Sequence, residues 1–186
     1  MAYLKRHIDA QLQEWKDSPR RKPLLIRGAR QVGKSTAVRE FGKSFRHFME
    51  INLERQPDLR QLFTENIDVK ATCDNLSGTL HIPIIPGETL LFIDEIQVCK
   101  EAIMALRYFK EDYPELHVIA AGSLLEFALE ELPSFGVGRI RSLYMYPFSF
   151  DEFLMAQGLE MSISYKSKAK SESPLPELAH KNLVEQ

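Results

Sequence analysis

The stretch LLIRGARQVGKST occupies residues 24–36 and joins a short apolar run to a helical pattern. Its residues 28–35, GARQVGKS, fit the pattern G-x-x-x-x-G-K-[ST] without a mismatch. Glycines allow the backbone to turn its N–H groups inward around a phosphate, and the following helix offers its positive N-terminus to the anion. The stretch therefore predicts a phosphate-binding loop rather than an ordinary tight turn.

The side chains of this loop have separate predicted roles. Lys34 is expected to reach the β- and γ-phosphates of a nucleotide and to act in catalysis, and Ser35 is expected to offer its hydroxyl to Mg²⁺. The residues expected to bind the nucleotide are Gly28, Ala29, Arg30, Gln31, Val32, Gly33, Lys34, Ser35 and Thr36.

Two acidic residues, Asp94 and Glu95, follow the apolar run LLFI. An aspartate at the end of a strand beside a phosphate loop can organise Mg²⁺, so Asp94 is the second predicted metal ligand. Glu95 is the predicted catalytic residue that orients and polarises an attacking water. By themselves the two acids could merely end a buried strand, but beside the phosphate loop their order favours hydrolysis of the γ-phosphate over its transfer to a small acceptor.

Two further catalytic candidates follow in the chain. Ser123, which ends the apolar run LHVIAAGS, could sense the γ-phosphate or the attacking water, or it could cap the helix predicted after it. Arg139 in GVGRIR could reach a phosphate in its own subunit or in a neighbouring one, or it could be an ordinary surface arginine. Arg107 is a weaker candidate, because a surface or interhelix contact explains it.

The apolar patterns of the chain alternate between strands and helices. This alternation predicts a three-layer α/β fold with a mainly parallel sheet, whose ligand site lies beyond the carboxyl ends of the strands. The predicted strands are 23–28, 47–54, 89–97, 116–123 and 138–149. The predicted helices are 3–16, 33–45, 57–66, 101–114, 124–132 and 149–158, the last with a capping box formed by Ser149 and Glu152. Residues 67–86 show no clear pattern, and 82–88 are expected to form a loop.

The order of the motifs LLIRGARQVGKST, TLLFIDEIQ, LRYF, VIAAGSLLEF and GRIRSLYMYPFSFDEFL resembles a family of AAA-superfamily P-loop ATPases of bacteria and archaea. Members of that family carry an uncharacterised, nuclease-like C-terminal domain. The resemblance covers residues 3–158. It implies a five-stranded parallel sheet with the phosphate-loop strand in the centre, ATP as the nucleotide, Walker A and Walker B motifs, Ser123 as sensor 1 and Arg139 as the arginine of a GR element.

The domain boundary is expected near residue 160. Residues 1–160 are predicted to form the AAA-type ATP-binding domain. From residue 161 the chain becomes polar and rich in Ser and Lys, and 176–186 look like the start of a helix that is cut off. Residues 161–186 are therefore expected to be a flexible linker and the start of a truncated lid or C-terminal region.

Composition limits the remaining possibilities. The formal net charge of -2 indicates neither a nucleic acid nor an anionic membrane as a partner, and no apolar run has the length of a membrane span. Cys73 and Cys99 do not have a C-x-x-C spacing. They are expected to be reduced thiols, which favours a cytoplasmic protein. The expected partners are a nucleotide and either further copies of the chain or another protein.

Three functions are compatible with these motifs. The first is a Mg²⁺-dependent ATPase domain that drives conformational change, and the second is a nucleotide-dependent switch with little hydrolysis. The third, a small-molecule kinase, would need an arginine-rich lid and an acceptor pocket, and the sequence shows neither. No N-K-x-D element for reading guanine is present.

Overall fold

The structure is a computed structural model that describes residues 3–63, 67–123, 125, 138–168, 177 and 181. The chain divides into two compact units. The larger unit is Ile8–Pro147, and the smaller unit combines Met1–His7 with Phe148–Gln186. The larger unit contains the sheet and the phosphate loop.

The sheet of the larger unit has five strands, and every pair of neighbouring strands is parallel. This confirms the predicted α/β fold with its parallel sheet. The strands are β1 (Leu24–Arg27), β2 (His47–Asn52), β3 (Thr89–Asp94), β4 (His117–Ala121) and β5 (Arg141–Tyr144).

The strand order is β2-β3-β4-β1-β5, so β4 occupies the centre of the sheet. The resemblance implied that the phosphate-loop strand is central, and this expectation is wrong, because β1 lies between β4 and β5. All residues of β3 and β4 are buried, as expected for strands covered on both faces. Strand order depends on which crossover connections pack together, and no pattern within one strand specifies it.

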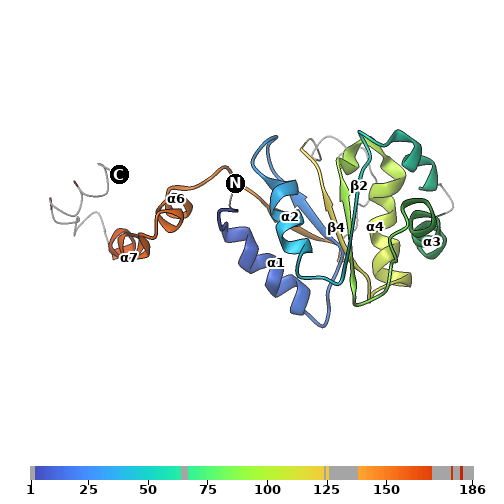
Figure 1. Cartoon of the computed structure of the whole chain (residues 1–186), viewed down its shortest axis with the longest axis horizontal. Helices are drawn as coiled ribbons and strands as arrows, with labels where there is room; N and C mark the ends of the chain where they lie inside the picture. Colours follow the sequence, from blue (N-terminus) through green and yellow to red (C-terminus); the bar gives the residue numbers. More distant parts are fainter. Residues whose placement is uncertain are drawn as a thin grey trace. The chain divides into compact units, whose positions relative to one another are not determined.

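Helices cover both faces of the sheet and complete three layers (Figure 1). On one face α1 (His7–Asp17) and α2 (Lys34–Gly42) pack against Leu24 and Ile26 of β1. On the other face α3 (Val69–Leu80) and α4 (Lys100–Asp112) share a buried cluster with Leu25. This alternation follows from the two-residue period of a strand, which sends successive side chains to opposite faces.

The structure differs from the predicted elements mainly between residues 57 and 88. Residues Pro57–Leu62 form a short 3₁₀ helix, η1, where a longer helix was predicted. The unassigned region contains α3, which begins at Val69. The Asp68 side chain caps it by accepting hydrogen bonds from the backbone N–H groups of residues 70 and 71. In α3 the apolar residues Val69, Cys73, Leu76 and Leu80 recur at spacings of four, three and four and pack into the core, which is a helical pattern that the sequence analysis did not recognise. Except for Leu125, the helix predicted at 124–132 lies outside the described residues.

The smaller unit confirms the predicted capping box at the start of α6 (Phe150–Ala156). The Glu152 carboxylate accepts hydrogen bonds from the backbone N–H of Ser149 at 2.8 Å and of His7 at 2.9 Å, and Arg6 Nε lies 2.9 Å from it. Burial raises the pKa of Glu152, but these hydrogen bonds and the charge of Arg6 outweigh it and lower the pKa to about 2. One carboxylate therefore caps the first turns of both α6 and α1.

Residues Glu160–Lys168 form α7, so the expected flexible linker is wrong for this part of the chain. The composition of the segment is polar, but Lys166 Nζ lies 2.6 Å from Asp151 Oδ1 of α6. This contact within the smaller unit helps to order a helix that has no apolar stripe of its own. Of the truncated helix expected at 176–186, only Glu177 and Lys181 are among the described residues.

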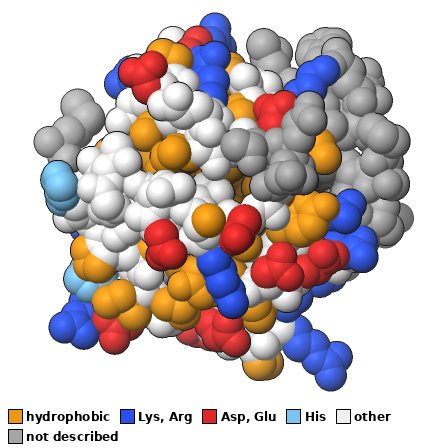
Figure 2. Space-filling view, turned by 90° about the vertical axis from the view of Figure 1, so that its right-hand side faces the viewer, with side chains coloured by type: hydrophobic (Ala, Val, Ile, Leu, Met, Phe, Trp, Pro, Cys, Tyr) orange, Lys and Arg blue, Asp and Glu red, His pale blue; other side chains and the backbone are white. Residues whose placement is uncertain are grey.

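The surface is charged but mixed in sign. Figure 2 views the molecule from the side of α3 and shows acidic and basic side chains interspersed with apolar ones. Within the part of the chain that the structure describes, no helix combines the length and the apolar character needed to cross a membrane.

Candidate functional site

The loop between β1 and α2 has backbone angles that depend on glycine. Gly28 has a φ of 140° and Gly33 a φ of 98°, both in the region that other residues rarely adopt. A Cβ atom on Gly28 would also overlap the backbone carbonyl oxygen of Met145, which follows β5. The loop therefore needs glycine at residue 28 for two reasons, one of which only the tertiary structure reveals.

Lys34 begins α2 and folds back into the loop. Its Nζ donates hydrogen bonds to the carbonyl oxygens of Gly28 and Ala29, both at 2.8 Å. Burial lowers the pKa of Lys34, and the carboxylates of Glu95 and Asp94 partly oppose this effect. The ammonium group is therefore held inside the curve of the loop, close to the amides that open α2.

Ser35 and Asp94 meet across the gap between α2 and the end of β3. Ser35 Oγ donates a hydrogen bond to Asp94 Oδ2 at 2.8 Å, and the Asp94 side chain is almost fully buried. Burial raises the pKa of Asp94, while the hydrogen bond from Ser35 lowers it. The sequence predicted these two oxygen donors as metal ligands, and the structure brings them together.

These oxygens fit Mg²⁺ by their chemistry. Mg²⁺ prefers hard oxygen ligands and is usually bound by one or two protein groups together with waters and phosphate oxygens. Among the described residues there is no cluster of three or more His, Cys, Asp or Glu side chains that could hold a metal by themselves. Ser35 and Asp94 supply two such oxygen donors.

Glu95 directly follows β3 and has a φ of 51°, which is unusual for a residue with a side chain. It precedes the short 3₁₀ helix η2 (Ile96–Val98). Its backbone N–H donates to Asp94 Oδ1 at 3.1 Å, and its carboxylate Oε2 accepts from Gln97 Nε2 at 2.6 Å. Strained backbone of this kind persists only where the surroundings fix it, and it occurs often at functional sites.

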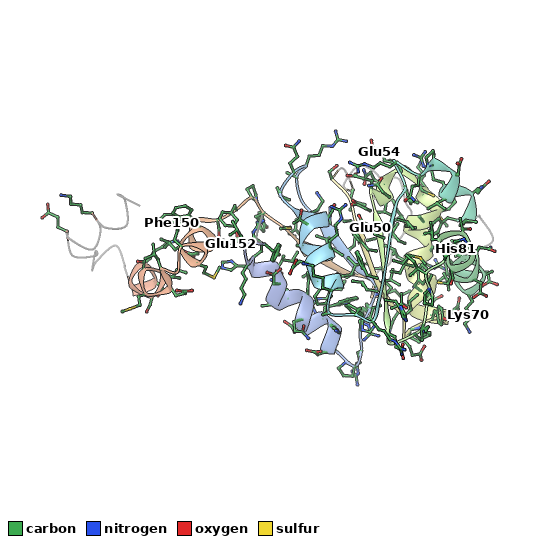
Figure 3. All side chains as sticks on the ribbon, in the orientation of Figure 1. Glu50, Glu54, Lys70, His81, Phe150 and Glu152 are labelled. Carbon is green, nitrogen blue, oxygen red and sulfur yellow. The ribbon has the colours of Figure 1, made fainter. Side chains whose placement is uncertain are left out.

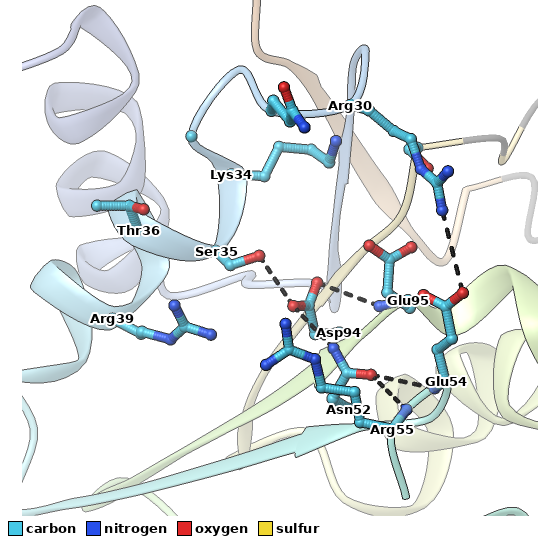
Figure 4. Close-up of a pocket in the computed structure, with 13 residues that line it drawn as sticks. Arg30, Lys34, Ser35, Thr36, Arg39, Asn52, Glu54, Arg55, Asp94 and Glu95 are labelled. Carbon is cyan, nitrogen blue, oxygen red and sulfur yellow. Dashed lines mark hydrogen bonds and ion pairs between the residues drawn. The ribbon is translucent and has the colours of Figure 1, made fainter. Parts of the chain in front are cut away.

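A cavity of about 430 Å³ lies at the carboxyl ends of the strands (Figure 4). Nine of the residues predicted for the site line it: Arg30, Gln31, Gly33, Lys34, Ser35, Thr36, Asp94, Glu95 and Ser123. Three predicted loop residues, Gly28, Ala29 and Val32, are not among its lining residues. Gly28 and Ala29 contribute through the carbonyl groups that bind Lys34, and Val32 packs against the apolar cluster beneath α1 and α2.

The two later candidates have different positions. Ser123 follows β4 and lines the cavity, and its buried Oγ has no hydrogen-bond partner among the described residues. Arg139 instead forms an ion pair with Glu111 of α4 and is not a lining residue. The predicted contact of Arg139 with a phosphate of its own subunit has no support in this arrangement, and action on a neighbouring copy stays a prediction. Arg107 hydrogen-bonds to Tyr108, the next residue of α4, so this bond is not the interhelix contact that was one of its expected alternatives.

Four lining residues were missed by the sequence reasoning: Arg39, Asn52, Glu54 and Arg55. Asn52 ends β2, and its amide Nδ2 donates to Asp94 Oδ2 at 3.3 Å. Its Oδ1 accepts from the backbone N–H groups of Glu54 at 3.1 Å and Arg55 at 2.9 Å. Its place at the end of a strand could have revealed Asn52, because the carboxyl ends of parallel strands share one edge of the sheet.

Arg39 had no such signal in the sequence. It lies on α2 and forms a bidentate pair with Glu50 of β2, with its Nη2 2.6 Å from Glu50 Oε1 and its Nε 2.8 Å from Oε2. Figure 3 shows Glu50 on this strand and Glu54 beyond its end, near the cavity. The hydrogen bonds with Glu50 raise the pKa of Arg39. The guanidinium therefore stays charged, and the carboxylate of Glu50 balances its charge.

Comparison with known protein families gives one match within this chain. The model of the family described as "AAA domain" matches residues 20–154, which include the phosphate loop, the acidic pair, Ser123 and Arg139. No curated protein matches the chain.

Proposed function

Because the chain belongs to the AAA domain family of P-loop ATPase-like proteins, we propose that it binds ATP with Mg²⁺ and hydrolyses it to ADP and phosphate. The hydrolysis would be coupled to a conformational change. The observation that carries this proposal is the 2.8 Å hydrogen bond between Ser35 and Asp94 in the cavity that also holds Lys34 and Glu95. In this proposal the loop after β1 would cradle the phosphates, Ser35 and Asp94 would be oxygen donors for a metal, and Glu95 would be the carboxylate base.

Each group has a distinct task in this proposal. Lys34 and the amides at the start of α2 would bind the phosphates, and Ser35 with Asp94 would hold Mg²⁺. The bound ion would supply positive charge that offsets the negative charge of the phosphates. Glu95 would orient a water and accept its proton, and Ser123 would donate a hydrogen bond from its Oγ to the γ-phosphate or to that water.

The wider assignments are proposals of the same kind. We place the ATP-binding domain at residues 1–160, with the remaining residues leading to a lid or C-terminal region. Arg139 would act on the nucleotide of a neighbouring copy, which would require its release from Glu111. The expected site of action is the cytoplasm.

A nucleotide-dependent switch with little hydrolysis is the second candidate. It is favoured by one observation, which is that Arg139 pairs with Glu111 outside the lining of the cavity. An arginine that stabilises the transition state is worth about 10³- to 10⁵-fold in rate in related chemistry. Without such a group the site would bind the nucleotide tightly and turn it over slowly.

Titration with a fluorescent ATP analogue and Mg²⁺ tests the binding step. The wild-type chain should bind, and Lys34→Ala should lose binding. Lys43→Ala is the matched control, because Lys43 lies exposed at the other end of α2 and pairs only with Glu40 among the described residues. A folded wild-type chain that binds no nucleotide would contradict both functions.

Phosphate release distinguishes the two candidates. If the chain is an ATPase, release should fall by about 10²-fold or more in Glu95→Gln, since a general base contributes that much. Equal and slow release by both proteins, together with tight Mg²⁺-dependent binding, would favour the switch.

A further inference from the structure

Gln97 forms a hydrogen bond with the predicted catalytic carboxylate of Glu95. Its Nε2 donates to Glu95 Oε2 at 2.6 Å, a short distance typical of a hydrogen bond to a charged acceptor. Gln97 is part of η2 and is not a lining residue of the cavity, whereas Glu95 lines it. The amide therefore holds a cavity-lining carboxylate without lining the cavity itself.

The orientation of the Gln97 amide is fixed by this contact. Only the NH₂ group can donate to a carboxylate, so the carbonyl Oε1 must point the other way. There it is buried and has no hydrogen-bond partner among the described residues. A buried carbonyl without a partner costs free energy, which is tolerated here while the amide holds the carboxylate.

Gly122, at the end of β4, leaves the space that this amide occupies. A Cβ atom at residue 122 would overlap Gln97 Oε1 and would lie 2.9 Å from Leu125 Cγ. The backbone of Gly122 has no positive φ, so the conformation itself does not require glycine. Glycine at residue 122 thus leaves room for the Gln97 amide, which a larger residue would displace.

We propose that Gln97 is a positioning residue for hydrolysis, which fixes the Glu95 carboxylate for the attacking water and is itself seated by Gly122. This inference rests on the proposed ATPase function. Among the described residues, Gln97 is the hydrogen-bond partner of the Glu95 carboxylate, whereas the backbone N–H of Glu95 bonds to Asp94 and its carbonyl accepts from the N–H of Val98 at 3.3 Å.

Gly122 also directly precedes a residue that lines the cavity. Ser123, the next residue, lines the cavity and has a buried hydroxyl without a partner among the described residues. A shift of this segment when Ser123 meets a phosphate would move the wall against which Gln97 Oε1 rests.

The kinetic test uses Gln97→Met, which keeps the length of the side chain and removes the N–H donors. We expect kcat for ATP to fall by about 10- to 100-fold, since misplacing a reacting group by 1 Å costs up to that much. KM and the melting temperature should stay at their wild-type values. Val98→Ala, in the same short helix but on an exposed side chain, is the matched control and should retain full activity.

Gly122→Ala provides an independent route to the same defect. The added methyl group meets the end of the Gln97 side chain and also the buried Leu125 side chain, so the melting temperature should fall somewhat, while kcat falls as in Gln97→Met. In a Glu95→Gln background neither substitution should lower turnover further, because the carboxylate that they misplace is already gone. A purely structural role would instead lower turnover further in that background.

Failure of this inference and failure of the proposed function give different results. If Glu95→Gln abolishes turnover while Gln97→Met retains wild-type kcat, Gln97 does not position the base, and the ATPase function stands. If Glu95→Gln leaves turnover unchanged, the proposed function is wrong. The contact itself is then decided by NMR of the ¹⁵N-labelled chain. The Gln97 side-chain amide signal, assigned by its loss in Gln97→Met, should shift in Glu95→Gln, and an unchanged signal overturns the inference.

Discussion

Acidification should destabilise the larger unit through His117. This residue begins β4 and is only 5% exposed, between the rings of Trp15 at 5.7 Å and Phe45 at 4.8 Å. Burial, followed by the nearby charges of Arg21 and Lys16, lowers the pKa of His117 to about 4. The folded state therefore keeps this imidazole neutral at pH values where the unfolded chain binds a proton.

The sign and size of the effect follow from the two pKa values. Above pH 6.5 His117 is neutral in both states and contributes no pH dependence. Between pH 6.5 and about 4 only the unfolded chain is protonated, so the free energy of unfolding falls as the pH falls. The shift of about 2.5 units, at about 1.4 kcal/mol per unit, gives a loss of about 3 kcal/mol that is complete below pH 4.

Urea denaturation at pH 7 and at pH 4 measures this loss. In His117→Leu the decrease between the two pH values should be smaller than in the wild type by about 3 kcal/mol. His81→Asn is the matched control, because His81 is exposed and its left-handed conformation suits asparagine. The control should keep the wild-type pH dependence. Equal pH dependence in His117→Leu and in the wild type would refute the reasoning.

Three further predictions follow from single contacts. Gly28→Ala should lower the free energy of unfolding by clearly more than Gly87→Ala, as measured by thermal denaturation. A side chain at residue 87 would meet no other atoms, so Gly87→Ala costs only about 1 kcal/mol of backbone strain. Asp94→Asn should remove the gain in ATP-analogue affinity that Mg²⁺ gives the wild type, measured by titration with and without the ion; an unchanged gain would exclude Asp94 as a ligand. Glu152→Gln should speed amide hydrogen exchange at His7 at pH 7. The difference from the wild type should shrink from about pH 4.5 and vanish near pH 2, where the wild-type carboxylate is protonated too; a difference that persists there would contradict the reported pKa.

The sequence alone determined the parts of the site that depend on neighbouring residues. The loop at residues 28–35 has its own glycine pattern, and the acidic pair ends a strand whose apolar run identifies it. The capping box of α6 likewise lies within four consecutive residues, Ser149 to Glu152. These features are legible because a backbone turn, a buried strand or a helix end imposes its requirement on a short stretch of chain.

The elements that the sequence did not reveal have weak or distant signals. The α3 helix has an apolar stripe, but its other positions are rich in residues of low helix propensity, including Gly78, which weakens the helical signal. The Gln97–Glu95 contact joins residues that are close in the chain. A glutamine two residues after a glutamate is nevertheless common, so the sequence does not show that the two side chains bond. The burial of His117 depends on Trp15 and Phe45, which come from other parts of the chain.

Only the tertiary structure decided how the strand ends are arranged around the cavity. The strand order β2-β3-β4-β1-β5 places Asn52 against Asp94, and α4 brings Glu111 to Arg139. Such pairings join residues far apart in the chain, so they depend on how the layers pack together. The sequence thus determined which chemical groups lie in the loop and at the strand ends. The packing of the sheet determined which of these groups meet, because the distance between two elements does not depend on the sequence of either element alone.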